Sequence, residues 1–350
     1  MTIYVLNPLN EPVASGGVQK LHDHVEILND AGLDACIVNP PAFTPWWFST
    51  RARIVRPPVT LQSGDLLAIP EVYGDRMPRL APGVPRISVN QNAFFSFENV
   101  HDPARHPYLR CPDLLGIMTM SRHDATYLTH TFPGIPVRRA YYRIDADMFA
   151  FAGGARPRKI AYMPRKRKAL ADQIVGSLHA RGALAGWDLQ ELRGMTQAQV
   201  ADALATAQLF LSFSQREGFG LPPAEALARG CHVIGYAGWG GNEFFSGPNA
   251  QLVLEDDLDG FISAVADWLA GPGWDAEIAQ TGSQAILRTY SKETERDSVL
   301  AAYATLQALR PAGGSATGTI TLQELAIPYR GPLRRMAGRV KAKLESLAGL

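Results

Sequence analysis

Two glutamates that bracket a glycine-rich loop are the clearest indication of a ligand-binding site in this sequence. Glu217 and Glu225 are separated by the residues GFGLPPA, and apolar runs precede and follow the stretch. Gly218 and Gly220 let the backbone approach a ligand closely, and Pro222 suits the first turn of a helix. A helix that begins here presents N–H groups and the positive end of its dipole to an anion. We therefore expect this loop to bind a phosphate.

The two carboxylates suit a different part of the same ligand. A carboxylate does not help to bind phosphate, but it accepts hydrogen bonds from the hydroxyl groups of a ribose or another sugar. The pattern thus fits a sugar that is linked through phosphate to a nucleoside. Each glutamate also has a simpler interpretation, in which Glu225 only complements the helix N-terminus and Glu217 is only solvated.

A second glycine pair, Gly16 and Gly17, follows the first predicted strand. The pair either brings the backbone close to a ligand or forms an ordinary turn between a strand and a helix. The third glycine of a dinucleotide fingerprint is missing, which argues against nicotinamide binding.

Strands and helices are predicted to alternate twice along the chain. The predicted strands cover 2–7, 34–40, 65–73, 85–92, 115–121, 137–142, 159–164, 187–192, 208–214 and 231–236. The predicted helices cover 18–32, 122–130, 170–184, 196–207, 222–229, 259–270 and 292–309, with Thr196 as an N-cap. Such alternation indicates parallel sheets covered by helices, and ligands bind where strands end and helices begin.

The break in this alternation, at 143–158, separates two expected domains. We expect an N-terminal Rossmann-like domain over 1–150, a C-terminal one over 151–310, and a linker with a basic segment over 311–350. The proline-rich stretch 41–58 is expected to be an irregular surface loop, and 311–319 a flexible connector.

Composition excludes several classes of protein. The chain has 350 residues, 46% hydrophobic and 19% charged, and a net charge of +1, which suits a globular protein and argues against a nucleic-acid partner. The three scattered cysteines are expected to be buried thiols in a reducing compartment. No leader or membrane-spanning run is recognised, so the expected location is the cytoplasm.

The stretch EGFGLPPAEALARGCHVI, residues 217–234, resembles the signature of the family 4 glycosyltransferases, and AGWGGNE, residues 237–243, resembles the segment that follows it. The resemblance covers most of the chain and is strongest in its second half. It implies the α/β GT-B fold, two Rossmann-like domains with doubly wound parallel sheets facing a cleft. It also implies transfer of a sugar from a nucleotide-diphosphate sugar to a glycan or lipid-linked acceptor, in surface polysaccharide assembly.

The resemblance also implies roles for the matched residues. Glu217 would lie at the donor sugar and Glu225 would hold the ribose hydroxyls. Arg165 and Lys166, or Lys168, would clasp the diphosphate. The backbone that would lie against the sugar and the phosphates is that of Gly16, Gly17, Gly218, Phe219, Gly220 and Leu221.

The sequence departs from the family pattern in two places. Met163-Pro164-Arg165 replaces the usual Gly-Arg, so the register of the cations in PRKRK stays open, and that run has a solvated basic turn as its alternative. The expected acceptor or cleft stretch offers Asn90, Gln91 and Asn92 where the family carries a histidine, while His101 lies farther on. No general base is assigned.

That gap is consistent with a retaining mechanism, in which the leaving diphosphate takes the proton of the acceptor. No obligatory metal or other cofactor is expected, because Glu255-Asp256-Asp257 precedes a helix and suits its N-terminus.

The segment 330–350 is basic and amphipathic, with six Lys and Arg residues and one Glu. It would lie on the inner face of an anionic membrane, pack on the first domain, or form a tail. The main alternative for the whole chain is a nucleotide-sugar or glycan-binding GT-B-like protein without turnover. A phosphorylase or epimerase on the same fold is a further one.

Overall fold

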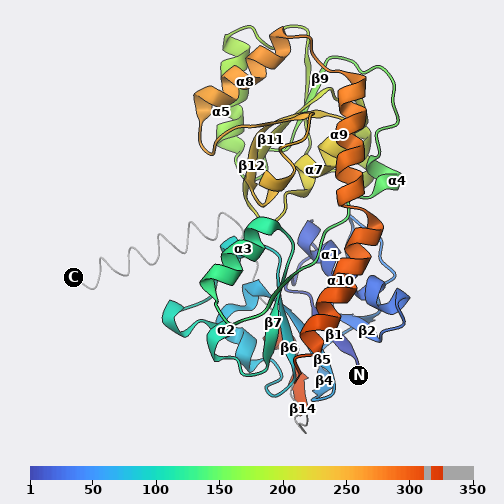
Figure 1. Ribbon diagram of the computed structural model, residues 1–350, viewed down its shortest axis with the longest axis vertical. Coiled ribbons are helices and arrows are strands. Elements are labelled where there is room, and N and C mark those ends of the chain that lie inside the picture. Colours follow the sequence, from blue (N-terminus) through green and yellow to red (C-terminus); the bar gives the residue numbers. More distant parts are fainter. Residues whose placement is uncertain (311–316, 326–350) are drawn as a thin grey trace, which may run out of the picture.

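The computed structural model describes residues 1–310 and 317–325, and it contains two parallel sheets (Figure 1). The first sheet has the order β3-β2-β1-β5-β6-β7-β8 and the second β10-β9-β11-β12-β13. The strands of the first are β1 (Ile3–Leu6), β2 (Ala35–Val38), β3 (Ile54–Val55), β5 (Leu66–Pro70), β6 (Arg86–Asn90), β7 (Leu114–Thr119) and β8 (Val137–Arg139). Those of the second are β9 (Lys159–Tyr162), β10 (Asp188–Glu191), β11 (Leu209–Glu217), β12 (His232–Trp239) and β13 (Ala250–Leu252).

Helices cover both sheets. The helices of the first part of the chain are α1 (Gly16–Asp30), α2 (Pro107–Arg110), α3 (Arg122–Thr131) and α4 (Ala146–Phe149). They are followed by α5 (Lys168–Ala180), α6 (Gln197–Thr206), α7 (Leu221–Ala228), α8 (Leu258–Ala270), α9 (Ala276–Thr289), α10 (Lys292–Gln307) and α11 (Leu322–Leu325). The described residues also contain the 3-10 segments η1 (Glu71–Arg79), η2 (Ala93–Phe95), η3 (Pro103–Arg105) and η4 (Gly240–Glu243).

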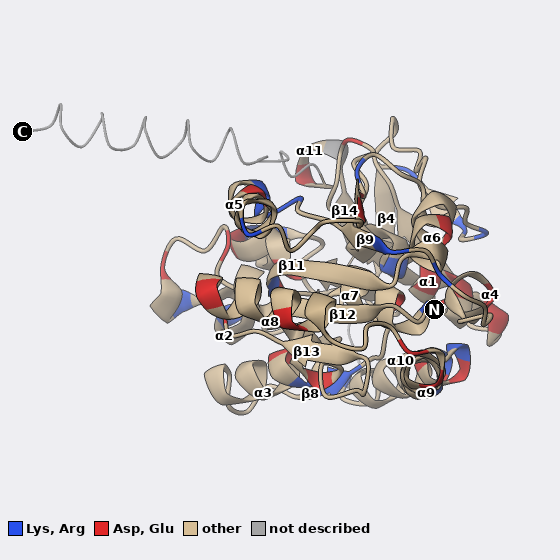
Figure 2. Cartoon of the chain, turned by 90° about the horizontal axis from the view of Figure 1, so that it is seen from above, with Lys and Arg blue, Asp and Glu red and all other residues tan. Residues whose placement is uncertain are grey.

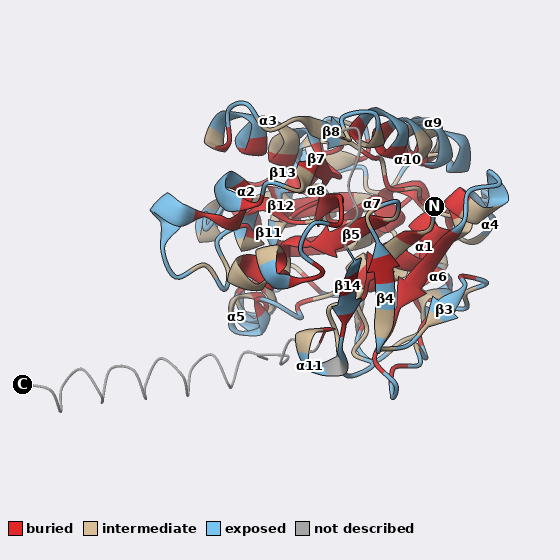
Figure 3. Cartoon of the chain, turned by 90° about the horizontal axis from the view of Figure 1, so that it is seen from below, coloured by how far each residue is buried: buried red, intermediate tan, exposed pale blue. Residues whose placement is uncertain are grey.

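The central strands are buried on both faces, as is usual for parallel sheets under helices, whereas edge strands such as β3 and β10 are partly exposed. All residues of β2, β5 and β6 are buried. Figure 3 shows the strands in red between helices whose outer sides are exposed. The predicted strands and helices are present, and Thr196 caps α6 in a capping box with Gln199. The three cysteines are buried and free, as predicted.

The last described helices return to the first domain, which the expected range 151–310 did not anticipate. α10 packs against α1, β7 and β8 rather than against the second sheet. The reason is the apolar face formed by Val299, Ala302 and Leu306, which is buried in the core shared with the first sheet.

Two segments expected to be irregular contain pairing or core residues. β14 (Thr317–Ile320) pairs antiparallel with β4 (Val59–Gln62), so Thr317–Thr319 are not a free connector. The stretch 41–58 includes β3, and it buries Phe43 and Trp47 in a small cluster with Val18. The segment 330–350 lies outside the described residues.

The chain crosses between the domains twice, and the crossings touch. Ile144 N donates to Tyr290 O at 2.8 Å. Acidic and basic residues are interspersed in the view of Figure 2. The basic run between β9 and α5 is confined to that one loop.

Candidate active site

The site predicted from the sequence lies where the two domains meet. The carboxyl ends of β9, β11 and β12 are opposite the loop between β1 and α1 and the loop after β6. Two hydrogen bonds join these edges: Asn92 Nδ2 donates to Arg216 O at 2.8 Å, and Arg165 Nη1 donates to Ala14 O at 3.2 Å. Residues from both halves of the sequence therefore share one site.

The helix α7 begins without a side-chain cap. Its N-cap residue, Gly220, has φ 95°, a left-handed conformation that glycine adopts at little cost. Pro222 and Pro223 carry no N–H, and Ala224 N already donates to Gly220 O at 3.4 Å. The N–H groups of Gly220 and Leu221 are therefore the backbone donors that this helix can offer an anion.

The glycines of the site allow close approach, between the domains at Gly16 and Gly218 and within the first domain at Gly17. A Cβ atom added to Gly16 would lie 2.6 Å from Leu221 Cδ1, and one on Gly17 would lie 2.7 Å from Gln91 Oε1. One on Gly218 would lie 1.9 Å from Gln91 O. A larger residue at Gly218 would push the two loops apart because it meets backbone, whereas at Gly16 and Gly17 the side chains of Leu221 and Gln91 would have to turn away.

The basic run after β9 divides into cations with different surroundings. Lys166 Nζ lies 2.8 Å from Glu217 Oε1, which brings two of the predicted residues into direct contact. Arg165 is exposed at the domain boundary. Lys168 instead pairs with Asp172 on its own helix and with Glu191, so it is engaged away from Glu217.

Arg167 belongs to the interior of the second domain. Its buried guanidinium pairs with Glu255 and Asp256 and lies 4.7 Å from the centre of the Tyr236 ring. Asp257 is the N-cap of α8, as its place before the helix predicted. Glu255 and Asp256 thus neutralise a buried arginine rather than only complementing that helix.

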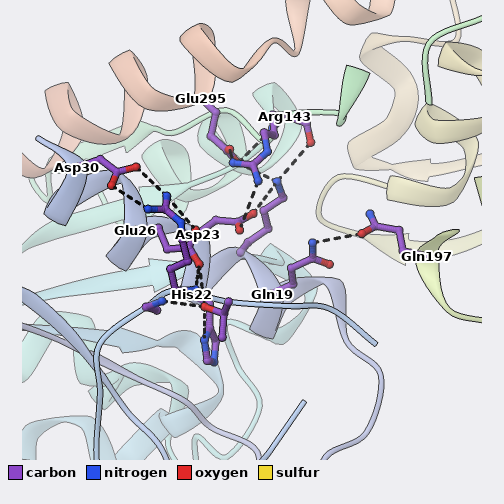
Figure 4. Close-up of polar contacts among 12 residues, drawn as sticks. Gln19, His22, Asp23, Glu26, Asp30, Arg143, Gln197 and Glu295 are labelled. Atoms are coloured by element: carbon purple, nitrogen blue, oxygen red, sulfur yellow. Dashed lines mark hydrogen bonds and ion pairs between the residues drawn. The ribbon is translucent and has the colours of Figure 1, made fainter. Parts of the chain in front are cut away.

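Glu225 is buried and linked across the domain boundary. Gln197 Nε2 donates to Glu225 Oε1 at 3.2 Å. Gln19 Nε2 in turn donates to Gln197 Oε1 at 3.4 Å (Figure 4). Burial raises the pKa of Glu225 to about 7, although the Gln197 hydrogen bond and the charge of Lys20 oppose the rise. The carboxyl group is thus poised to change charge near neutral pH.

A buried ionic cluster behind the site ties α1 to α10 and to the first crossing (Figure 4). Lys20 Nζ lies 2.8 Å from Glu295 Oε1 and 3.2 Å from Asp23 Oδ2. Arg143 Nη1 lies 3.1 Å from Glu295 Oε2. Burial lowers the pKa of Lys20, but the two carboxylates raise it more, so the lysine is held charged.

Of the three predicted amides at the end of β6, two reach the domain boundary. Gln91 Nε2 donates to Gly17 O at 2.9 Å and to Tyr142 Oη at 2.8 Å, and Asn92 binds the second domain. Asn90 does not lie in the cleft. It is fully buried and its amide donates to Ser96 Oγ at 2.8 Å, because it still belongs to the buried strand β6, whereas Gln91 and Asn92 follow the end of that strand.

Sequence reasoning missed several residues at this boundary. Glu71 Oε2 accepts from Gln91 N at 3.1 Å, and burial raises the pKa of Glu71 to about 8. Glu243, noted only as the end of the Gly-rich segment, receives Arg139 Nη2 at 2.6 Å. Each partner lies far away in sequence, so no local pattern could have indicated the pairing.

Within the described ranges, 1–310 and 317–325, no group of three or more His, Cys, Asp or Glu side chains is placed to hold a metal ion. Among the helices in those ranges, none has the length and apolar character needed to cross a membrane. His101 is exposed and bound to Asp75 at 2.7 Å.

Comparisons with known proteins fit this architecture. Residues 158–300 match the family model described as glycosyl transferase-like. An alpha-1,6-glucosyltransferase of Actinobacillus pleuropneumoniae serotype 7 (strain AP76) is 26% identical over 293 residues, which are 79% of this chain and 81% of that protein.

Two solved structures are similar along their whole length. The sucrose-phosphate synthase from Thermosynechococcus elongatus has a TM-score of 0.63 and 14% identity, and the match covers 88% of this chain and 99% of that one. Anabaena HepE, solved in complex with UDP and glucose, has a TM-score of 0.59 and 14% identity, covering 87% and 100%. The chain has the two-domain GT-B fold, and it is a glycosyltransferase.

Proposed function

We propose that the chain transfers glucose from UDP-glucose to a saccharide acceptor, with retention at the anomeric carbon and without an obligatory metal. The observation that carries the proposal is the loop between Glu217 and Glu225, which joins an uncapped helix start to two carboxylates and to Lys166. UDP and glucose are suggested by the bound HepE structure, and the alpha product is suggested by the curated relative.

In this proposal, different residues bind different parts of the donor. Arg165, Lys166 and the N–H groups of Gly220 and Leu221 stabilise the negative charge of the diphosphate. Glu225, when ionised, accepts hydrogen bonds from the ribose hydroxyl groups. Glu217 accepts hydrogen bonds from the hydroxyl groups of the transferred sugar. The ammonium of Lys166 has three N–H donors, so it can direct one of them to a phosphate oxygen from its place beside Glu217.

The chemical step needs no general base from the protein. The bond between the anomeric carbon and the β-phosphate oxygen breaks, and the bond to the acceptor oxygen forms on the same face of the sugar. The acceptor proton moves to the leaving phosphate oxygen, and UDP departs. The protein contributes preorganised positive charge and alignment of the two substrates.

A thermal-shift panel of UDP-, GDP-, dTDP- and CMP-sugars tests the donor assignment. UDP-glucose should raise the melting temperature of the wild type, because it binds only the folded state, and Glu225→Ala should abolish the rise. The exposed Glu277→Ala is the matched control and should keep it. No response to any nucleotide would contradict the proposal.

Turnover separates an enzyme from a binding protein without chemistry. UDP release from UDP-glucose in the presence of saccharides, measured with and without EDTA, should continue in both conditions. Donor binding without UDP release would favour the binding-protein alternative.

We further propose that residues 330–350 hold the enzyme at an anionic membrane surface. The support is the sequence alone, with its basic and apolar residues at helical spacing. The full chain should float with vesicles that contain phosphatidylglycerol but not with phosphatidylcholine vesicles. A chain ending at residue 329 should not float with either kind of vesicle.

A further inference from the structure

Three aromatic rings form a row across the domain boundary. Phe94 and His123 stack with ring centres 5.8 Å apart at 16°, and His123 and Trp239 lie 5.7 Å apart at 35°. Phe94 and His123 belong to the first domain, and Trp239 ends β12 of the second. Phe94 is 36% exposed and Trp239 46% exposed, so the row offers apolar ring surface to solvent.

The first-domain part of the row is held rigidly. Asn92 Oδ1 accepts from Phe94 N at 3.1 Å, while its amide binds the second domain. His123 Nδ1 lies 3.0 Å from Oδ1 of the buried Asp124, whose Oδ2 accepts from Ala93 N at 3.1 Å. His123 Nε2 has no hydrogen bond to the residues that the structure describes, so it remains available to a ligand.

Trp239 occupies a backbone conformation that suits glycine. Its φ is 74°, which is rare for a bulky residue, and positions 238, 240 and 241 are all glycines. A ring that is half exposed contributes little to the core, so packing does not account for a tryptophan here. Strain retained around an exposed ring points to a role in binding.

The row begins beside the donor loop. Trp239 pairs with Glu217 in the register of β12 and β11. The two loops are tight, since a Cβ atom on Gly240 would lie 2.2 Å from Gly218 O. The row therefore runs from the predicted donor-sugar residue outward along the boundary between the domains.

We propose that Phe94, His123 and Trp239 form the subsite for a pyranose ring of the acceptor saccharide. The apolar C–H face of a sugar packs on aromatic rings, while its hydroxyls need a few polar partners at the edge. His123 Nε2 and the exposed guanidinium of Arg122 are such partners. The proposal rests on the proposed function, because it supplies the acceptor for that donor site.

Trp239→Gly is the informative variant, because glycine accepts the left-handed conformation and the fold is not put at risk. Trp239→Phe keeps an aromatic face. Leu254→Ala, at an apolar residue that is 73% exposed elsewhere on the second domain, is the control. Acceptor and donor KM are measured separately by UDP release, with UDP-glucose as donor and methyl α-glucoside, methyl β-glucoside or isomaltose as acceptor.

Trp239→Gly should raise the acceptor KM about fivefold, which corresponds to the loss of roughly 1 kcal/mol of stacking, and leave the donor KM within about twofold. Trp239→Phe should fall between this variant and the wild type, and Leu254→Ala should match the wild type. An unchanged acceptor KM overturns the proposal. An equal rise in both KM values with a lower melting temperature also overturns it, because the row would then only hold the domains together.

Fluorescence separates failure of this subsite from failure of the donor assignment. The same saccharides should change tryptophan emission in the wild type with UDP present, and should not do so in Trp239→Phe. If UDP-glucose does not bind, the donor proposal fails, and the saccharides titrated alone still decide the subsite. No difference between the two proteins in that titration contradicts it.

Discussion

The two helices that begin at the domain boundary, α1 and α7, are built in opposite ways. α1 is capped by Ser15, whose Oγ accepts from Val18 N at 3.4 Å, and it buries charged residues along its length. α7 has no side-chain cap, starts at a left-handed glycine and is otherwise almost wholly apolar and buried. At the start of α1 a side chain of the protein accepts a hydrogen bond from the first turn, whereas at the start of α7 no side chain does so. An unsatisfied helix start in a buried place indicates a ligand-binding role.

The largest expected effect lies in the charges of α1. Lys20→Met should lower the free energy of unfolding by about 3 kcal/mol, because the two buried carboxylates of Glu295 and Asp23 would be left with Arg143 as their remaining cation. Urea unfolding measures the loss, and adding Glu295→Gln should recover part of it. The exposed Lys292→Met should change little. A small loss for Lys20→Met would mean that water reaches the cluster.

On α7, by contrast, removing the charge of Glu225 should stabilise the fold, and the gain should depend on pH. The pKa of Glu225 is raised in the folded state, so the stability linked to its neutral form is full below about pH 4.5 and is lost as pH rises through about 7. Glu225→Gln should therefore stabilise the chain at pH 8 relative to pH 5, by on the order of 2 kcal/mol, while weakening UDP-glucose binding. Melting temperatures at the two pH values test this. An equal change at both would show that the carboxyl group is not buried in solution.

Gly220→Ala should affect both binding and stability. The left-handed φ would cost about 1–2 kcal/mol, and the misplaced N–H groups should weaken the binding of UDP several-fold. Calorimetric titration with UDP measures the second effect. Normal affinity in this variant would remove the start of α7 from the phosphate site.

Ser15→Ala should have the smallest effect. The lost cap costs about 1 kcal/mol of stability, and UDP affinity should stay near that of the wild type, since α1 serves its own structure. A large loss of affinity would erase the contrast between the helices and give α1 a direct part in donor binding.

The local pattern predicted α7 and its loop well, because the glycines, prolines and glutamates that define them lie within nine residues, 217–225. The burial and pairing of the charged residues of α1 could not be predicted from nearby sequence. Lys20 looks like a solvated residue on an amphipathic helix, and its partner Glu295 lies 275 positions away. The return of α10 to the first domain follows from packing that no nearby sequence specifies.

Side-chain direction limited the predictions at a finer scale. In PRKRK the sequence could not tell that Arg167 turns inward to Glu255 while Lys166 reaches Glu217. After β6 it could not tell that Asn90 turns into the core and Gln91 toward Gly17. The residue types were informative, whereas their orientation depended on tertiary contacts.

The paired crossings have a consequence for how this chain can be divided. Ile144 and Tyr290 are hydrogen-bonded neighbours, so the intervening segment leaves and re-enters the first domain at one place. In genetic terms the second domain is a cassette with adjoining ends. It can be exchanged for that of another enzyme at two neighbouring junctions, which would replace the half that carries the proposed donor loop while the first domain keeps its own chain continuity through α10 and β14.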